Sequence, residues 1–159
     1  MRELNRVIKA WGFPTQLEPR QFGGSEDVKR PDLAVYTSRT SPIIDVTVVT
    51  NTAPSHCEKI DAAAGAAQAK TTKHEENVNS KGNYKFYPIV CETSGHIDSA
   101  FDDFVALLTS ALPFGSKKQF RREMCFAVSV ALQRGNARIM KHAYGRLEDA
   151  NTFGRRKCF

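Results

Sequence analysis

The chain has 159 residues, of which 41% are hydrophobic and 25% are charged, and its formal net charge is +6. This length suits one domain with a buried core. No apolar run reaches the roughly 18 residues that cross a bilayer, and the first residues lack an apolar signal core, so we expect an intracellular protein. The basic excess favours a polyanionic partner.

The spacing of cysteines and histidines argues against several kinds of site. The four cysteines are scattered without a Cys-x-x-Cys pair, which fits neither a zinc site nor a disulfide framework. The four histidines show no metal-ligand spacing such as His-x-x-x-His. A Walker-type phosphate loop and a Gly-x-Ser-x-Gly elbow are both absent from the sequence. We expect reduced cysteines and no small-molecule cofactor other than a divalent metal.

The apolar periodicity predicts an ordered series of helices and strands. Residues 4–11 form a helix, 16–22 a weak strand interrupted by Pro19, and 32–36 and 43–49 two strands joined as an antiparallel hairpin. An alanine-rich helix spans 57–78, a strand 84–91, and two helices 98–112 and 117–144. We therefore predict an α/β fold of three layers, a small mixed sheet flanked by helices, over residues 1–144. Residues 145–159 form a basic tail that we expect to be flexible.

Two acidic residues lie in the apolar strands. Asp32 opens one strand and Asp45 lies inside the next. A carboxylate buried in a strand is costly unless it is paired or bound to a cation, and two on neighbouring strands outline a divalent metal site. The alternative is that Asp32 only caps a turn after Pro31 and that Asp45 lies on a solvated face.

Two lysines on the following helix complete a candidate catalytic set. Lys70 and Lys73 are three residues apart, so both can project from one helix face. Hydrolysis of a phosphodiester needs an offset phosphate charge and an activated water, which carboxylate-held metal and a nearby lysine can supply. The alternative is that the lysines form a solvated helix end that complements the helix dipole.

These residues resemble the PD-(D/E)xK nuclease superfamily, in which an aspartate after proline opens one strand and an acid, any residue and a lysine follow on the next. The chain reads Arg-Pro-Asp at 30–32 and Asp-Val-Thr at 45–47, so Thr47 stands where the lysine is expected. In some branches that lysine lies on the following helix, and Lys70 and Lys73 occupy that place.

One branch is more similar, the restriction-like endonuclease domain of non-LTR retrotransposons. The chain has Lys-Thr-Thr-Lys-His at 70–74, where His74 replaces a tyrosine of the family pattern. It also has Phe-Tyr-Pro-Ile-Val-Cys-Glu-Thr-Ser-Gly at 86–95 and Ser-Val-Ala-Leu-Gln-Arg-Gly-Asn-Ala at 129–137. With Glu-Pro at 18–19, the resemblance runs from about residue 18 to residue 140.

The resemblance implies a restriction-endonuclease-like core and a Mg²⁺- or Mn²⁺-dependent DNA endonuclease that nicks target DNA to prime reverse transcription. It assigns the metal to Asp32, Asp45 and the backbone carbonyl of Val46, with Glu18 as an outer ligand. Lys70 is the first choice for the catalytic lysine and Lys73 the second. Supporting roles are implied for three further residues: Thr47, His74 and Glu92.

DNA contact is expected from the basic cluster Lys117, Lys118, Arg121 and Arg122, and then from 155–157. The alternative for the cluster is a charged, solvated helix start.

Other hypotheses are a nucleic-acid-binding module with a decayed site and a nuclease for branched DNA or RNA. Cleavage of both strands would require a homodimer, for which no interface is predicted. No reverse transcriptase or zinc knuckle is present, so we expect an excised domain or a free-standing relative, located in the nucleus or wherever its DNA target resides.

Overall fold

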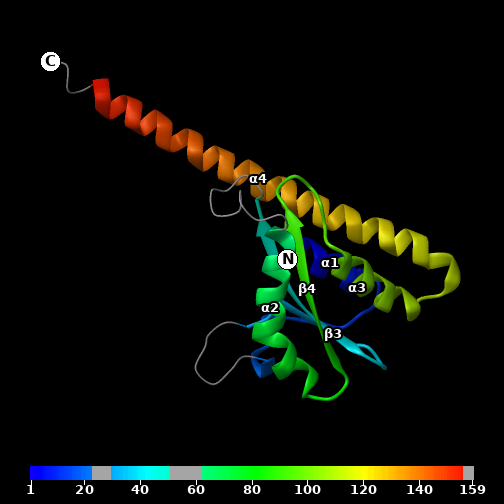
Figure 1. Cartoon of the computed structure of the whole chain (residues 1–159). Helices are drawn as coiled ribbons and strands as arrows, with labels where there is room; N and C mark the ends of the chain where they lie inside the picture. The colour runs from blue at the N-terminus through cyan, green and yellow to red at the C-terminus, as the bar shows by residue number, and fades with distance from the viewer. Residues whose placement is uncertain (23–29, 51–61, 156–159) are drawn as a thin grey trace.

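The computed structural model describes residues 1–22, 30–50 and 62–155, with side chains described as far as residue 145. Helices and strands are interspersed along the chain, and the last three elements are helical (Figure 1). The elements are α1 (Arg2–Ala10), β1 (Thr15–Leu17), the 3₁₀ turn η1 (Arg20–Phe22), β2 (Leu33–Val35), β3 (Ser41–Val49), α2 (Ala62–Asn79), β4 (Tyr84–Glu92), α3 (Ser99–Ser110), the 3₁₀ turn η2 (Phe114–Ser116) and α4 (Lys117–Arg155).

The strands form one mixed sheet in the order β1-β2-β3-β4. Pairs β1–β2 and β2–β3 are antiparallel, whereas β3 and β4 run parallel. A parallel pair needs a crossover connection, and α2 lies between these two strands in the chain. The prediction of an α/β fold with a small mixed sheet flanked by helices is confirmed (Figure 1).

The alternation of side chains along β3 divides the molecule into layers. Ile44 is fully buried in a core with residues of α1, α3 and α4, and Val46 packs against the same core. Ile43 and Val49 point to the other face, where they pack in two smaller clusters with residues that include Val78 and Ala63 of α2. Asp45 alternates with Ile44, so it faces the α2 layer.

The structure differs from the sequence-based boundaries at two places. The predicted strand over 16–22 ends at Leu17, because Glu18 takes a positive φ of 46° and Pro19 has no amide proton to donate. Residues 20–22 form η1 instead. The prediction that the last helix ends at residue 144 is also wrong, because α4 continues to Arg155 and extends away from the sheet (Figure 1). The predicted start of the alanine-rich helix, 57–61, lies outside the described residues.

Within the part of the chain that the structure describes, no helix is both long and apolar enough to cross a membrane.

The contact between α4 and the N-terminal segment supports the helix layer that covers one face of the sheet. Phe120 of α4 is fully buried, and its ring lies 5.4 Å from that of Trp11 and 6.0 Å from that of Phe13, measured between centroids. We predict that Phe120→Ala lowers the free energy of unfolding by about 3–5 kcal/mol in urea denaturation, because it leaves a cavity. The control is Phe114→Ala, since that side chain is 92% exposed and should change stability by about 0.5 kcal/mol at most. Equal effects of the two changes would contradict this view of the core.

Candidate functional site

The antiparallel pairing of β2 and β3 brings the two acidic residues together. Leu33 pairs with Ile44, so one further step along the two strands places Asp32 opposite Asp45. The amide of Asp32 donates to the carbonyl of Ile44 at 3.0 Å, and the amide of Val46 donates to Asp32 Oδ2 at 2.8 Å. Side chains opposite each other in a ladder share a sheet face. The two carboxylates therefore lie side by side, and backbone hydrogen bonds orient Asp32.

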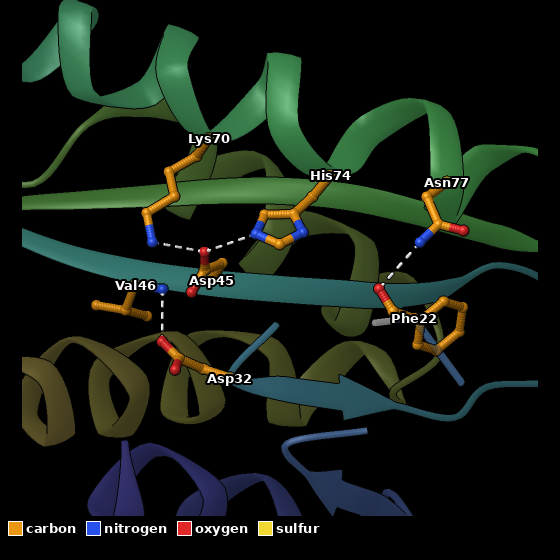
Figure 2. A network of polar contacts seen from close by, with 7 residues as sticks. All are labelled: Phe22, Asp32, Asp45, Val46, Lys70, His74 and Asn77. Carbon is orange, nitrogen blue, oxygen red and sulfur yellow. Dashed lines mark hydrogen bonds and ion pairs between the residues drawn. The ribbon is translucent and has the colours of Figure 1, made fainter. Parts of the chain in front are cut away.

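Helix α2 places two basic side chains above Asp45 (Figure 2). Lys70 Nζ lies 2.6 Å from Asp45 Oδ2, and His74 Nε2, one turn further along the helix, lies 3.5 Å from the same oxygen. The i, i+4 spacing puts both residues on the helix face that covers the sheet. Asp45 is only 4% exposed, so the alternative that it lies on a solvated face is wrong.

Burial decides which basic residue balances the charge of Asp45. The His74 side chain is buried, and this burial lowers its pKa below the usual value of 6.5, although the carboxylate of Asp45 opposes the shift. A histidine with a lowered pKa is neutral at pH 7. Lys70 therefore supplies the positive charge beside Asp45, and a buried carboxylate without such a partner would be strongly destabilising.

The surroundings of Asp32 disfavour its charged form, although the hydrogen bond from the Val46 amide stabilises that form. Loss of solvent on burial raises its pKa, and the neighbouring Asp45 raises it further through charge repulsion and a hydrogen bond to the protonated form. The hydrogen bond from the Val46 amide and the charge of Lys70 act in the opposite direction. A cation bound between the two carboxylates would reduce the repulsion that raises the pKa of Asp32.

The carboxylates open into a cleft of about 410 Å³. Three acidic residues, three basic residues and one apolar residue line it: Glu18, Asp32, Asp45, Arg30, Lys70, Lys73 and Val46. Their formal charges cancel, so a divalent cation would leave the cleft with a net positive charge. Such a cleft would then attract a phosphate group.

The donor atoms suit a hard, hydrated cation. Within residues 1–22, 30–50 and 62–155, no cluster of three or more His, Cys, Asp or Glu side chains is arranged to hold a metal ion. The cleft is lined by the adjacent acidic residues Asp32 and Asp45, together with Val46 and the acidic Glu18. Mg²⁺ is commonly bound through one or two carboxylates and keeps several waters, so these residues fit Mg²⁺ or Mn²⁺.

Six of the sequence-predicted residues line this cleft, and the others do not. Glu18, Asp32, Asp45, Val46, Lys70 and Lys73 line it. Thr47 is two residues beyond Asp45 on the same strand, and its side chain is not among those that line the cleft. Glu92, at the end of β4, also lies outside the lining, and its Oε2 accepts a hydrogen bond from Ser94 at 2.9 Å.

The predicted DNA-binding cluster is not brought to the cleft. Lys117, Lys118, Arg121 and Arg122 start α4, which covers the sheet face opposite to α2. Arg121 pairs with Asp102 of α3 at 2.7 Å, and Lys118 and Arg122 line a separate groove.

Sequence reasoning missed one residue of the cleft, Arg30, and did not predict how closely His74 contacts Asp45. Arg30 lines it, and its place directly before the Pro-Asp pair was the available signal. His74 was expected only to support the site, but it is buried against Asp45, and its Nε2 has no hydrogen-bond partner. Its position one helical turn after Lys70 could have predicted that both residues reach the same carboxylate.

No family model matches this chain, and a search of curated proteins gives no significant match. A role for the cleft therefore has to be argued from its own residues.

Backbone strain at Glu18 yields a matched pair of variants. Its φ of 46° lies in the left-handed region, where a residue with a Cβ is strained by about 1 kcal/mol or more. We predict that Glu18→Gly is more stable than Glu18→Ala by about 1 kcal/mol in urea denaturation, because both lose the carboxylate and only glycine relieves the strain. Equal stability of the two variants would show that this backbone conformation is not retained in solution.

The raised pKa of Asp32 predicts a pH-dependent stability in metal-free buffer. An acid whose folded-state pKa lies above its unfolded value of 3.8 favours folding when protonated, and this contribution is lost as pH rises through the folded pKa. We therefore expect Asp32→Asn to be more stable than the unchanged protein at pH 7 with a chelator present. The difference should shrink as pH falls towards 3.8, measured by thermal unfolding. An Asp32→Asn protein that is less stable at pH 7 would contradict the predicted direction of the pKa shift.

Proposed function

We propose that this protein is a Mg²⁺- or Mn²⁺-dependent DNA endonuclease that hydrolyses a phosphodiester bond in the cleft between α2 and the β2–β3 hairpin. One observation carries the proposal: Lys70 Nζ lies 2.6 Å from the buried carboxylate of Asp45, and Asp32 lies beside it on the neighbouring strand. Two carboxylates can hold a divalent metal for hydrolysis of a phosphodiester, and a nearby lysine can orient the attacking water.

The acidic residues would hold the metal. Asp32 and Asp45 are the two carboxylates, with the backbone carbonyl of Val46 beside them and Glu18 as an outer ligand at the wall of the cleft. When bound, the metal supplies charge neutralisation at the phosphate and lowers the pKa of a bound water. The hydrogen bond from the Val46 amide fixes Asp32 before any ligand arrives, which reduces the reorganisation that binding requires.

The basic residues of the cleft would act on the phosphate and on the water. Lys70 reaches Asp45 from α2, so its ammonium group can orient a nucleophilic water and offset charge on the phosphate. Lys73 and Arg30 line the same cleft and can hold the flanking phosphates. Thr47 stands on the strand where the family pattern has a lysine, and Lys70 of the next helix takes over the role of that lysine.

DNA is the proposed substrate and a nick in duplex DNA the proposed product, as in target-site cleavage by the retrotransposon nucleases that the sequence resembles. A second candidate is a nucleic-acid-binding module whose nuclease site has decayed. The observation that favours it is that Lys70 already occupies Asp45 Oδ2, an oxygen that metal binding would use.

A plasmid-nicking assay tests catalysis. With Mg²⁺ present, we predict that Asp45→Ala and Lys70→Ala each lower the nicking rate at least about a hundredfold, because they remove a metal ligand and the proposed water-orienting group. Lys141→Ala is the matched control, since Lys141 is exposed on α4 outside the cleft. Nicking at the unchanged rate by both cleft variants would overturn the proposed roles.

Metal titration separates an active nuclease from a decayed one. In calorimetry, we predict that Mn²⁺ binds the unchanged protein and that Asp32→Ala removes this binding, because a carboxylate ligand is lost. His142→Ala serves as the control for a surface metal ligand, since His142 is exposed on α4. Absence of Mn²⁺ binding to the unchanged protein would favour the decayed module.

A further inference from the structure

A second concave surface lies on the other side of the sheet from the cleft. It is a groove of about 870 Å³ between α1 and the first part of α4, and we name it the α1/α4 groove. The residues used below are Arg6 of α1 and Lys118, Gln119, Arg122, Glu123 and Phe126 of α4. Both helices pack on the Ile44 face of the sheet, whereas the cleft lies on the α2 face.

The groove carries a row of basic residues that ends in an aromatic ring. Lys118, Arg122 and Phe126 follow one another at intervals of four residues, so they form a single row along α4. Arg6 faces this row from α1. The three cationic side chains thus converge from two helices on one surface.

The acidic residue in the groove is engaged by neighbours. Glu123 Oε2 accepts a hydrogen bond from Trp11 Nε1 at 2.7 Å, and Oε1 accepts one from Gln119 Nε2 at 2.9 Å. Both carboxylate oxygens therefore have a donor from the protein, and three cationic side chains against one carboxylate leave the groove with a positive formal charge. Arg6 also contacts Glu3 at 3.3 Å, but its side chain is 76% exposed and can move towards an anion.

In the described part of the chain, the ring of Phe126 at the end of the row is exposed. Phe126 is 68% exposed, although the residues on either side of its turn contribute to the core. An exposed ring beside cationic side chains is the arrangement with which proteins bind single-stranded nucleic acid, because phosphates contact the cations and a base stacks on the ring. Paired bases in a duplex do not offer their faces to such a ring.

We propose that the α1/α4 groove binds a single-stranded nucleic acid, with phosphates on Arg6, Lys118 and Arg122 and an unpaired base on Phe126. This site is separate from the cleft and does not depend on cleavage there. It also gives Lys118 and Arg122 a function on a surface from which they do not reach the cleft.

The experiment measures binding of the full chain to a fluorescein-labelled thymidine dodecamer by anisotropy, over a series of salt concentrations. Phe126→Ala should weaken binding by about fivefold to about a hundredfold, the usual range for loss of one base–aromatic stack. Phe126→Leu, which keeps an apolar side chain, should weaken it similarly. The double change Arg6→Ala/Arg122→Ala should reduce the slope of log K against log salt by about 1.4, since each phosphate contact in a single strand contributes about 0.7.

The matched control is the double change Arg138→Ala/Lys141→Ala, which removes the same charge from exposed positions of α4 outside the groove. The control change should lower the affinity for the dodecamer less than Arg6→Ala/Arg122→Ala does. In the control background, Phe126→Ala should weaken binding by the same factor as in the unchanged protein. The titrations contain a chelator, so that metal-dependent cleavage in the cleft does not contribute to the measured binding. A duplex of the same length should be bound with no loss on Phe126→Ala.

The single tryptophan provides a second readout. Trp11 is hydrogen-bonded to Glu123 in the groove wall, so its emission should change on titration with the unlabelled dodecamer and not with the duplex. The proposal is overturned if Phe126→Ala and Phe126→Leu bind the single strand as tightly as the unchanged protein. It is equally overturned if the control double change matches the groove double change in both affinity and salt slope.

Discussion

The ion pair between Lys70 and Asp45 is the interaction on which the cleft depends. Asp45 lies within the central strand β3, and its carboxylate is almost completely removed from water. A buried carboxylate is tolerated only with a partner, and α2 supplies it from the layer above the sheet. The small side chains of that helix, such as the buried Ala63, let it lie close enough for Lys70 to reach. The site therefore forms only when α2 packs on the sheet.

The two faces of the sheet serve different purposes because successive side chains of β3 point to opposite faces. Its Ile44 face builds the main core with α1, α3 and α4, and its Asp45 face carries the charged cleft beneath α2. The long helix α4 can thus present basic and aromatic residues without reaching the cleft. If both surfaces contact nucleic acid, the substrate engages the protein from two sides, with cleavage on one and a single-stranded portion held on the other.

The sequence predicted the fold well where hydrophobic periodicity was strong. The β2–β3 hairpin, α3 and the strand β4 follow from alternating or helical apolar patterns. The short β1 was misjudged because the positive φ of Glu18, where the strand ends, is not encoded in the apolar pattern. The convergence of Asp32, Asp45 and Lys70 was predictable from motif order. The separation of the basic cluster from the cleft was not, since it depends on which sheet face α4 covers.

We propose that the paired carboxylates form a metal site, and anomalous X-ray diffraction from crystals grown with Mn²⁺ tests this proposal most directly. We predict an anomalous peak at about 2.0–2.3 Å from one carboxylate oxygen of Asp32 and one of Asp45, the coordination distance of such cations. Lys70 should remain beside Asp45 in the same crystals. A cleft without an anomalous peak, with Lys70 Nζ still in contact with Asp45 Oδ2 in a crystal saturated with Mn²⁺, would contradict the claim.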